Sequence, residues 1–161
     1  MTRSYLQAIY QIIETGHWIT DQISKELREF DSTEPQYNVL RILSDQQGKP
    51  ITVREIQDQM VQRSSNVTRI IDRLLAKGLV DRKECSANRR KMDITLTKKG
   101  KQFLTKLDRK VMSFHTPMSD NLSDSELQQL RTLILKLKER NNEKDLRHRR
   151  KVLSENTSLT V

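Results

Sequence analysis

The sequence contains few of the residues that build disulfide-rich, metal-binding or membrane proteins. It has one cysteine in 161 residues, so neither an internal disulfide nor a four-thiolate metal site can form. Its three histidines lack a paired ligand spacing, and its four glycines are too scattered to form a phosphate-binding loop. No apolar run approaches the roughly 20 residues that span a bilayer, and residues 1–15 do not resemble an export signal. We therefore expect a cytoplasmic protein with no membrane contact and no cofactor, and nothing indicates an enzyme.

The charged residues are abundant and unevenly placed. Hydrophobic residues make up 34% of the chain and charged residues 32%, with a net charge of +9. Residues 63–110 hold fifteen Lys or Arg and only five Asp or Glu. A basic segment of this kind is typical of a nucleic-acid site, where cations neutralise phosphates. Charge alone fits a solvated surface equally well.

Apolar periodicity and capping residues predict a mainly helical chain. Apolar residues recur at three- and four-residue steps from Tyr5 to Phe30, which indicates one long helix. Thr52 with Glu55, and Ser123 with Glu126, form capping boxes that start later helices, and Pro117 is expected to end the helix before the second box. The predicted helices span residues 5–30, 34–44, 53–60, 65–77, 98–115 and 124–147.

The helix predicted over 65–77 has the pattern of a DNA-recognition helix. Ser64 is its expected N-cap, Gly78 its stop, and Val67, Ile70, Ile71 and Leu74 its buried stripe. The polar side chains at its beginning suit the major groove, because Asn can pair with adenine and Arg with guanine. An ordinary amphipathic helix is the alternative. The expected contact residues are Arg63, Ser64, Ser65, Asn66, Thr68, Arg69 and Arg73.

Two strand-like runs follow, at 79–84 and 92–96, joined by the polar stretch 85–91. This pattern predicts a β-hairpin wing. The expected fold is therefore mainly α, a winged helix-turn-helix with long terminal helices and a two-stranded wing. Cys85 lies at the edge of the wing, where it is either a redox-sensitive thiol or an inert one.

Several separated blocks resemble MarR-type transcriptional regulators. They read VTRIIDRL at 67–74, KGLVDR at 77–82, NRR at 88–90 and LTKKG at 96–100, in the order and spacing of that family. A looser similarity extends over most of residues 5–147. One departure is Asn88, where the family usually has an aspartate that orients the neighbouring arginine.

The resemblance implies a homodimer that binds a palindromic operator in double-stranded DNA, and we expect a repressor. Residues 34–100 would form the DNA-binding lobe and residues 4–30 and 101–147 the dimerisation helices, with 152–161 a disordered tail. Arg89 and Arg90 at the wing tip would reach the minor groove or backbone, and Arg82 would support the wing's base. The terminal helices alternatively pack only within one chain.

The resemblance also implies release of DNA by a small aromatic or phenolic effector bound between the dimerisation helices and the lobe. His17, Trp18, Tyr37 and Asn38 are the candidate lining residues, and core or interface residues are the alternative. A rival function is a helical dimeric protein-interaction module without sequence-specific DNA binding. The arginines at the recognition and wing positions weigh against it.

Overall fold

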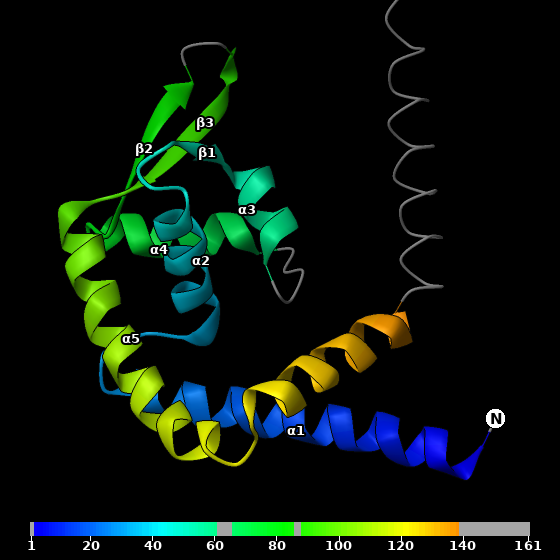
Figure 1. Cartoon of the computed structure of the whole chain (residues 1–161). Helices are drawn as coiled ribbons and strands as arrows, with labels where there is room; N and C mark the ends of the chain where they lie inside the picture. The colour runs from blue at the N-terminus through cyan, green and yellow to red at the C-terminus, as the bar shows by residue number, and fades with distance from the viewer. Residues whose placement is uncertain (1, 61–65, 86–87, 139–161) are drawn as a thin grey trace, which may run out of the picture. The chain divides into compact units, whose positions relative to one another are not determined.

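The computed structural model describes residues 2–60, 66–85 and 88–138, and the side chains within these ranges other than those of 85–91. It contains five labelled helices and three strands in the described ranges, followed by a further helix over residues 124–138 (Figure 1). The labelled elements are α1 (Arg3–Arg28), α2 (Glu34–Asp45), β1 (Ile51–Thr52), α3 (Val53–Gln59), α4 (Val67–Ala76), β2 (Val80–Cys85), β3 (Asn88–Leu96) and α5 (Lys98–Ser119).

The predicted winged helix-turn-helix fold is confirmed. The sheet is antiparallel with strand order β1-β3-β2, and Arg82 of β2 and Ile51 of β1 both pair with Ile94 of β3. The β2–β3 hairpin projects beyond the helices (Figure 1). β1 was not predicted, because a two-residue strand depends on a partner more than forty positions away rather than on local sequence.

The chain divides into two compact units, residues 1–116 and 117–161. The first unit contains one core formed by α1, α2, the helix-turn-helix, the sheet and α5. The side chains that are almost completely buried there are Leu27, Val39, Leu40, Leu43, Ile56, Ile71, Leu74, Val80, Ile94 and Leu107. This core fixes α4 and the wing strands against α2 and α5.

Local capping explains several of the helix boundaries. Thr52 and Glu55 form the predicted box, with the Thr52 amide 2.7 Å from a Glu55 carboxylate oxygen and the Glu55 amide 3.3 Å from the Thr52 hydroxyl. The Ser123–Glu126 box is also present.

The prediction that Pro117 ends α5 was wrong, because the helix continues through it to Ser119. A proline removes only its own amide hydrogen bond, so the loss is small within two residues of a helix end.

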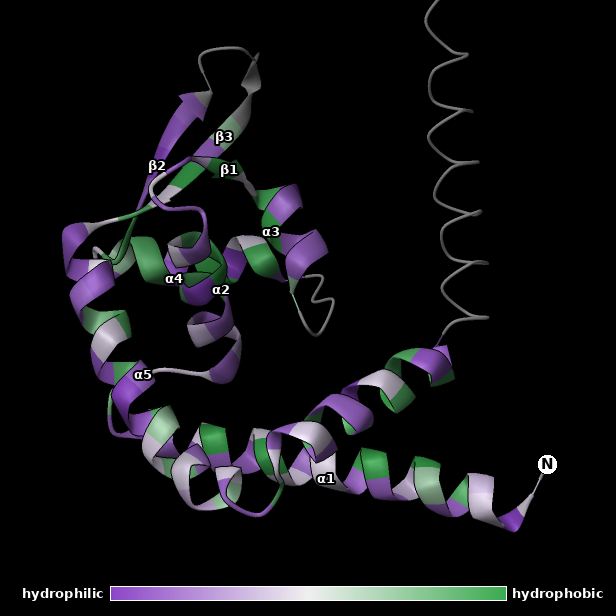
Figure 2. Cartoon of the chain, viewed as in Figure 1, coloured by the Kyte–Doolittle hydropathy of each residue, from purple (hydrophilic) through white to green (hydrophobic). Residues whose placement is uncertain are grey.

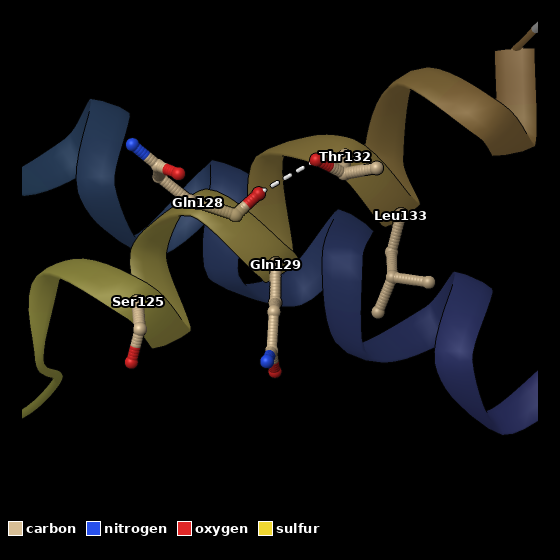
Figure 3. A pocket seen from close by; sticks show the side chains of 5 residues that line it. All are labelled: Ser125, Gln128, Gln129, Thr132 and Leu133. Atoms are coloured by element: carbon tan, nitrogen blue, oxygen red, sulfur yellow. Dashed lines mark hydrogen bonds between the residues drawn. The ribbon is translucent and has the colours of Figure 1, made fainter.

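The helix over 124–138 carries polar and apolar side chains on different sides. Ser125, Gln129 and Leu133 point to one side, while Gln128 and Thr132 point to another (Figure 3). The Thr132 hydroxyl donates to the Gln128 carbonyl at 2.8 Å. No helix within the described ranges is long and apolar enough to cross a membrane.

Candidate nucleic-acid interface

The candidate recognition helix α4 begins at Val67, with Asn66 at the N-cap. The prediction placed Ser65 and Asn66 inside the helix, and it was wrong at Asn66, whose φ of −113° and ψ of 20° are not helical. Asn is among the preferred N-cap residues, which explains the later start. The predicted contact residues Arg63, Ser64 and Ser65 lie outside the described residues.

The two sides of α4 differ in chemistry. Val67, Ile71 and Leu74 are at most 2% exposed and hold the helix against the core. Thr68, Arg69 and Arg73 are exposed. The helix therefore presents hydrogen-bonding side chains, two of them cationic, on the side that the core leaves open.

One ion pair joins α4 to the wing. Arg82 of β2 donates to a carboxylate oxygen of Asp72 on α4 at 3.1 Å. The guanidinium is fixed in a fork geometry, so the contact restrains the first wing strand relative to the helix. Both side chains are partly exposed, 32% for Arg82 and 55% for Asp72, so the pair contributes little to stability by itself.

The wing tip is only partly described. Asn88 begins β3, and Arg89 and Arg90 follow in the same strand. Their side chains lie outside the described part of the structure, as does the side chain of Cys85. The expected roles of these residues therefore remain predictions.

Arg73 lies apart from the Arg82 contact. It lines a pocket of about 390 Å³ where the turn between α1 and α2 meets the end of α4. Lys77, which caps the C-terminus of α4, lines the same pocket and pairs with Asp31 at 2.8 Å. Arg73 thus belongs to the C-terminal end of the helix rather than to its reading end.

A second pocket lies between α1 and α2. It measures about 220 Å³ and is lined by Ile23, Glu34, Tyr37, Asn38 and Arg41. Burial is the main cause of a raised pKa at Glu34, and it also raises the pKa of the Tyr37 hydroxyl. The pocket therefore combines an apolar wall with one acidic and one cationic side chain.

Tyr37 connects this pocket to α5. Its hydroxyl donates to a carboxylate oxygen of Asp108 at 2.7 Å and accepts from Arg41 at 3.3 Å. Arg41 also lies 3.7 Å from Asp108. The network joins α2 of the DNA-binding lobe to α5.

The structure separates the four candidate effector residues into two groups. Tyr37 and Asn38 line the 220 Å³ pocket. Trp18 instead packs edge-on against Phe114 of α5, with ring centroids 5.7 Å apart, and His17 is exposed on α1. The four side chains therefore do not line one pocket.

The arrangement of α2 to β3 corresponds to a known family. The model of the MarR family matches residues 32–92, which include both helices of the helix-turn-helix and the wing. The chain belongs to the MarR family. It is a transcriptional regulator of the DNA-binding, winged-helix type.

Two curated proteins show the extent of the similarity to other MarR-type chains. The HTH-type transcriptional regulator TcaR of Staphylococcus aureus (strain Newman) is 24% identical over 135 residues, covering 82% of this chain and 87% of TcaR. The HTH-type transcriptional regulator TtmR of Methylorubrum extorquens (strain PA1) is 29% identical over 102 residues, covering 63% of this chain and 51% of TtmR.

Solved structures agree on the fold. AbsC, a MarR family transcriptional regulator from Streptomyces coelicolor, superposes with a TM-score of 0.77 at 24% identity, covering 89% of this chain and 97% of AbsC. A MarR transcription factor from Planctomyces limnophilus gives 0.63 at 29% identity, covering 80% and 93%.

Sequence reasoning missed the acidic partners in this MarR-family chain. Asp72 holds Arg82, Asp108 holds Tyr37, and Asp31 holds Lys77. Asp72 was within reach, because it is the acidic residue of the quoted block VTRIIDRL. Asp31 and Asp108 lie 46 and 71 positions from their partners, and no local pattern signals such contacts.

Proposed function

We propose that the protein is a homodimeric repressor that binds a palindromic operator, with α4 reading base edges in the major groove and the wing contacting the adjacent minor groove or backbone. The observation that carries this proposal is the exposed side of α4, where Thr68 and Arg69 stand beside an Arg82-restrained wing. Arg can form bidentate hydrogen bonds with guanine. We infer that the regulator acts in the cytoplasm, on DNA.

Exposed apolar side chains support the dimer. Tyr10 and Ile13 of α1 are 70% and 50% exposed, and Leu133 of the last described helix is 63% exposed (Figure 2). Such residues along helices are costly to leave in water, and a second copy would bury them. A two-fold dimer would present two α4 helices about 34 Å apart, one helical turn of DNA, which accounts for a palindromic operator.

The DNA-binding proposal is tested by selecting fragments from sheared genomic DNA of the source organism and measuring affinity by fluorescence polarisation. Arg69→Ala should lose about 1–3 kcal/mol of binding free energy for the selected fragment and relax its sequence preference. Arg89→Ala should weaken binding with a smaller loss of salt dependence, about 0.9 per phosphate contact.

Arg109→Ala is a matched control, since Arg109 is an exposed cation of α5 outside the proposed interface. It should leave the sequence preference unchanged. Failure of the wild-type chain to enrich any fragment would favour the rival interaction module. Sedimentation equilibrium tests the dimer separately, and a monomer at micromolar concentration would refute it.

We further propose that a small aromatic or phenolic compound binds the pocket beside Tyr37 and Asn38 and weakens DNA binding. A cavity of about 150 Å³ holds one benzene ring, so the volume of about 220 Å³ suits a single substituted ring. Benzoate and phenol are suitable probes in a thermal-shift assay, because a ligand of the native state raises the melting temperature. Asn38→Leu should abolish the shift, and an unchanged shift in this variant would place the ligand elsewhere.

A further inference from the structure

The turn after α1 is joined to the C-terminal end of α4 by one lysine. The Lys77 ammonium group lies 2.8 Å from a carboxylate oxygen of Asp31 and also donates to the Asp31 backbone carbonyl. Asp31 lies three residues beyond the end of α1 at Arg28. The contact therefore connects the long first helix directly to the candidate recognition helix.

The backbone is constrained on both sides of this contact. Asp31 has a φ of +48°, a left-handed conformation that Asp and Asn tolerate better than other side chains. The carbonyl of Lys77 accepts a hydrogen bond from the Lys99 ammonium group at 2.7 Å, and Gly78 follows with a φ of +68°. The Lys77 ammonium group is the main cause of a lowered pKa at Asp31.

We propose that Asp31 and Lys77 are positioning residues that set the orientation of α4 relative to the end of α1, and thereby the affinity for operator DNA, without contacting DNA. This inference rests on the proposed function, in which the N-terminal part of α4 reads the DNA. Lys77 is eleven residues from Asn66, about 16 Å along the helix axis. A tilt of about 5° at the C-terminal end moves the reading end by about 1 Å over that length. Such a displacement is sufficient to impair hydrogen bonds to base edges.

The sign of one substitution separates positioning from simple electrostatics. Asp31 is an anion, and DNA is a polyanion, so removing this charge should strengthen DNA binding if the residue has no other role. A positioning role predicts the opposite for the specific site. Asp31→Asn is the suitable variant, because Asn also tolerates the left-handed backbone.

The experiment compares variants of the full chain on two duplexes, a fragment that the wild type selects from sheared genomic DNA and a mixed-sequence duplex of equal length. Asp31→Asn should lower affinity for the selected fragment by about twofold to fivefold, the range that an exposed ion pair supports, and should not weaken binding to the mixed duplex. Lys77→Met should give the same loss on the selected fragment with an unchanged salt slope. Lys77→Arg should restore wild-type affinity.

Asp21→Asn is the matched control, since it removes the same charge from an exposed position of α1. It should leave both affinities unchanged or slightly raised. The proposal is overturned if Asp31→Asn behaves like this control. It is also overturned if Lys77→Met weakens both duplexes equally and lowers the salt slope by about 0.9, because Lys77 would then be a phosphate contact.

A measurement without DNA distinguishes failure of the link from failure of the proposed function. The amides of Lys77, Gly78 and Leu79 donate to carbonyls of α4 at 3.2, 2.8 and 2.9 Å. Amide hydrogen exchange at these three positions should be faster in Asp31→Asn than in Asp21→Asn. Equal exchange rates would refute the link even if the wild type selected no fragment, an outcome that would refute only the proposed function.

Discussion

Substitution of Gly100 should destabilise the protein through one steric contact. An added Cβ at this position of α5 would lie 2.0 Å from the Leu79 carbonyl oxygen and 2.8 Å from a methyl carbon of Leu96. No real Cβ approaches a backbone oxygen so closely, and the oxygen cannot move without the chain between α4 and β2. Overpacking of this kind costs about 3 kcal/mol or more, while alanine regains about 1 kcal/mol of helix propensity. Gly100→Ala should therefore lower the free energy of unfolding by about 2 kcal/mol.

Thermal denaturation followed by circular dichroism checks this value. A loss of about 2 kcal/mol corresponds to a fall in Tm of about 4–8 °C for a chain of this size. Gly16→Ala is the matched control, because nothing in the chain lies within 4 Å of a Cβ at that position in the middle of α1. The same substitution there should raise stability by about 0.5–1 kcal/mol through helix propensity. A Tm of Gly100→Ala equal to or above that of Gly16→Ala would refute the reasoning.

Three further predictions concern the polar contacts. Asp72→Asn and Arg82→Ala should each weaken operator binding while changing stability by less than about 1 kcal/mol, and a double-mutant cycle that gives no coupling in DNA affinity would contradict the link between α4 and the wing. Tyr37→Phe should cost about 1–2 kcal/mol of unfolding free energy, because the Asp108 carboxylate loses a donor; chemical denaturation measures it, and an unchanged midpoint would oppose it. Burial raises the pKa of Glu34 in the folded state, so its contribution to stability is present below the unfolded pKa and is lost as pH rises through the folded pKa. Glu34→Gln should therefore raise Tm more at pH 7 than at pH 4, and an equal difference at both would exclude this cause.

The sequence was sufficient for the elements whose signals are local. The Thr52–Glu55 box and the apolar stripe from Val67 to Leu74 act over one to two helical turns, so the helix-turn-helix could be predicted from them. β1 and the partners of Lys77 could not, because these depend on which distant segments the fold brings together. The start of α4 was predicted two residues too early because Ser64 and Asn66 are both good N-cap residues.

The contacts at the C-terminal end of α4 explain how a short helix can read DNA with one end free. The Thr97 hydroxyl donates to the carbonyl of Gly78 at 2.9 Å, and Lys99 donates to that of Lys77 at 2.7 Å. Lys77 in turn contacts Asp31. The C-terminus of α4 is thus tied to α5 and to the turn after α1, while its buried stripe holds it to the core. With that end fixed, a change at either junction, such as the strain expected at Gly100 or loss of the Asp31 charge, would alter DNA binding through the angle of α4 rather than through a lost DNA contact.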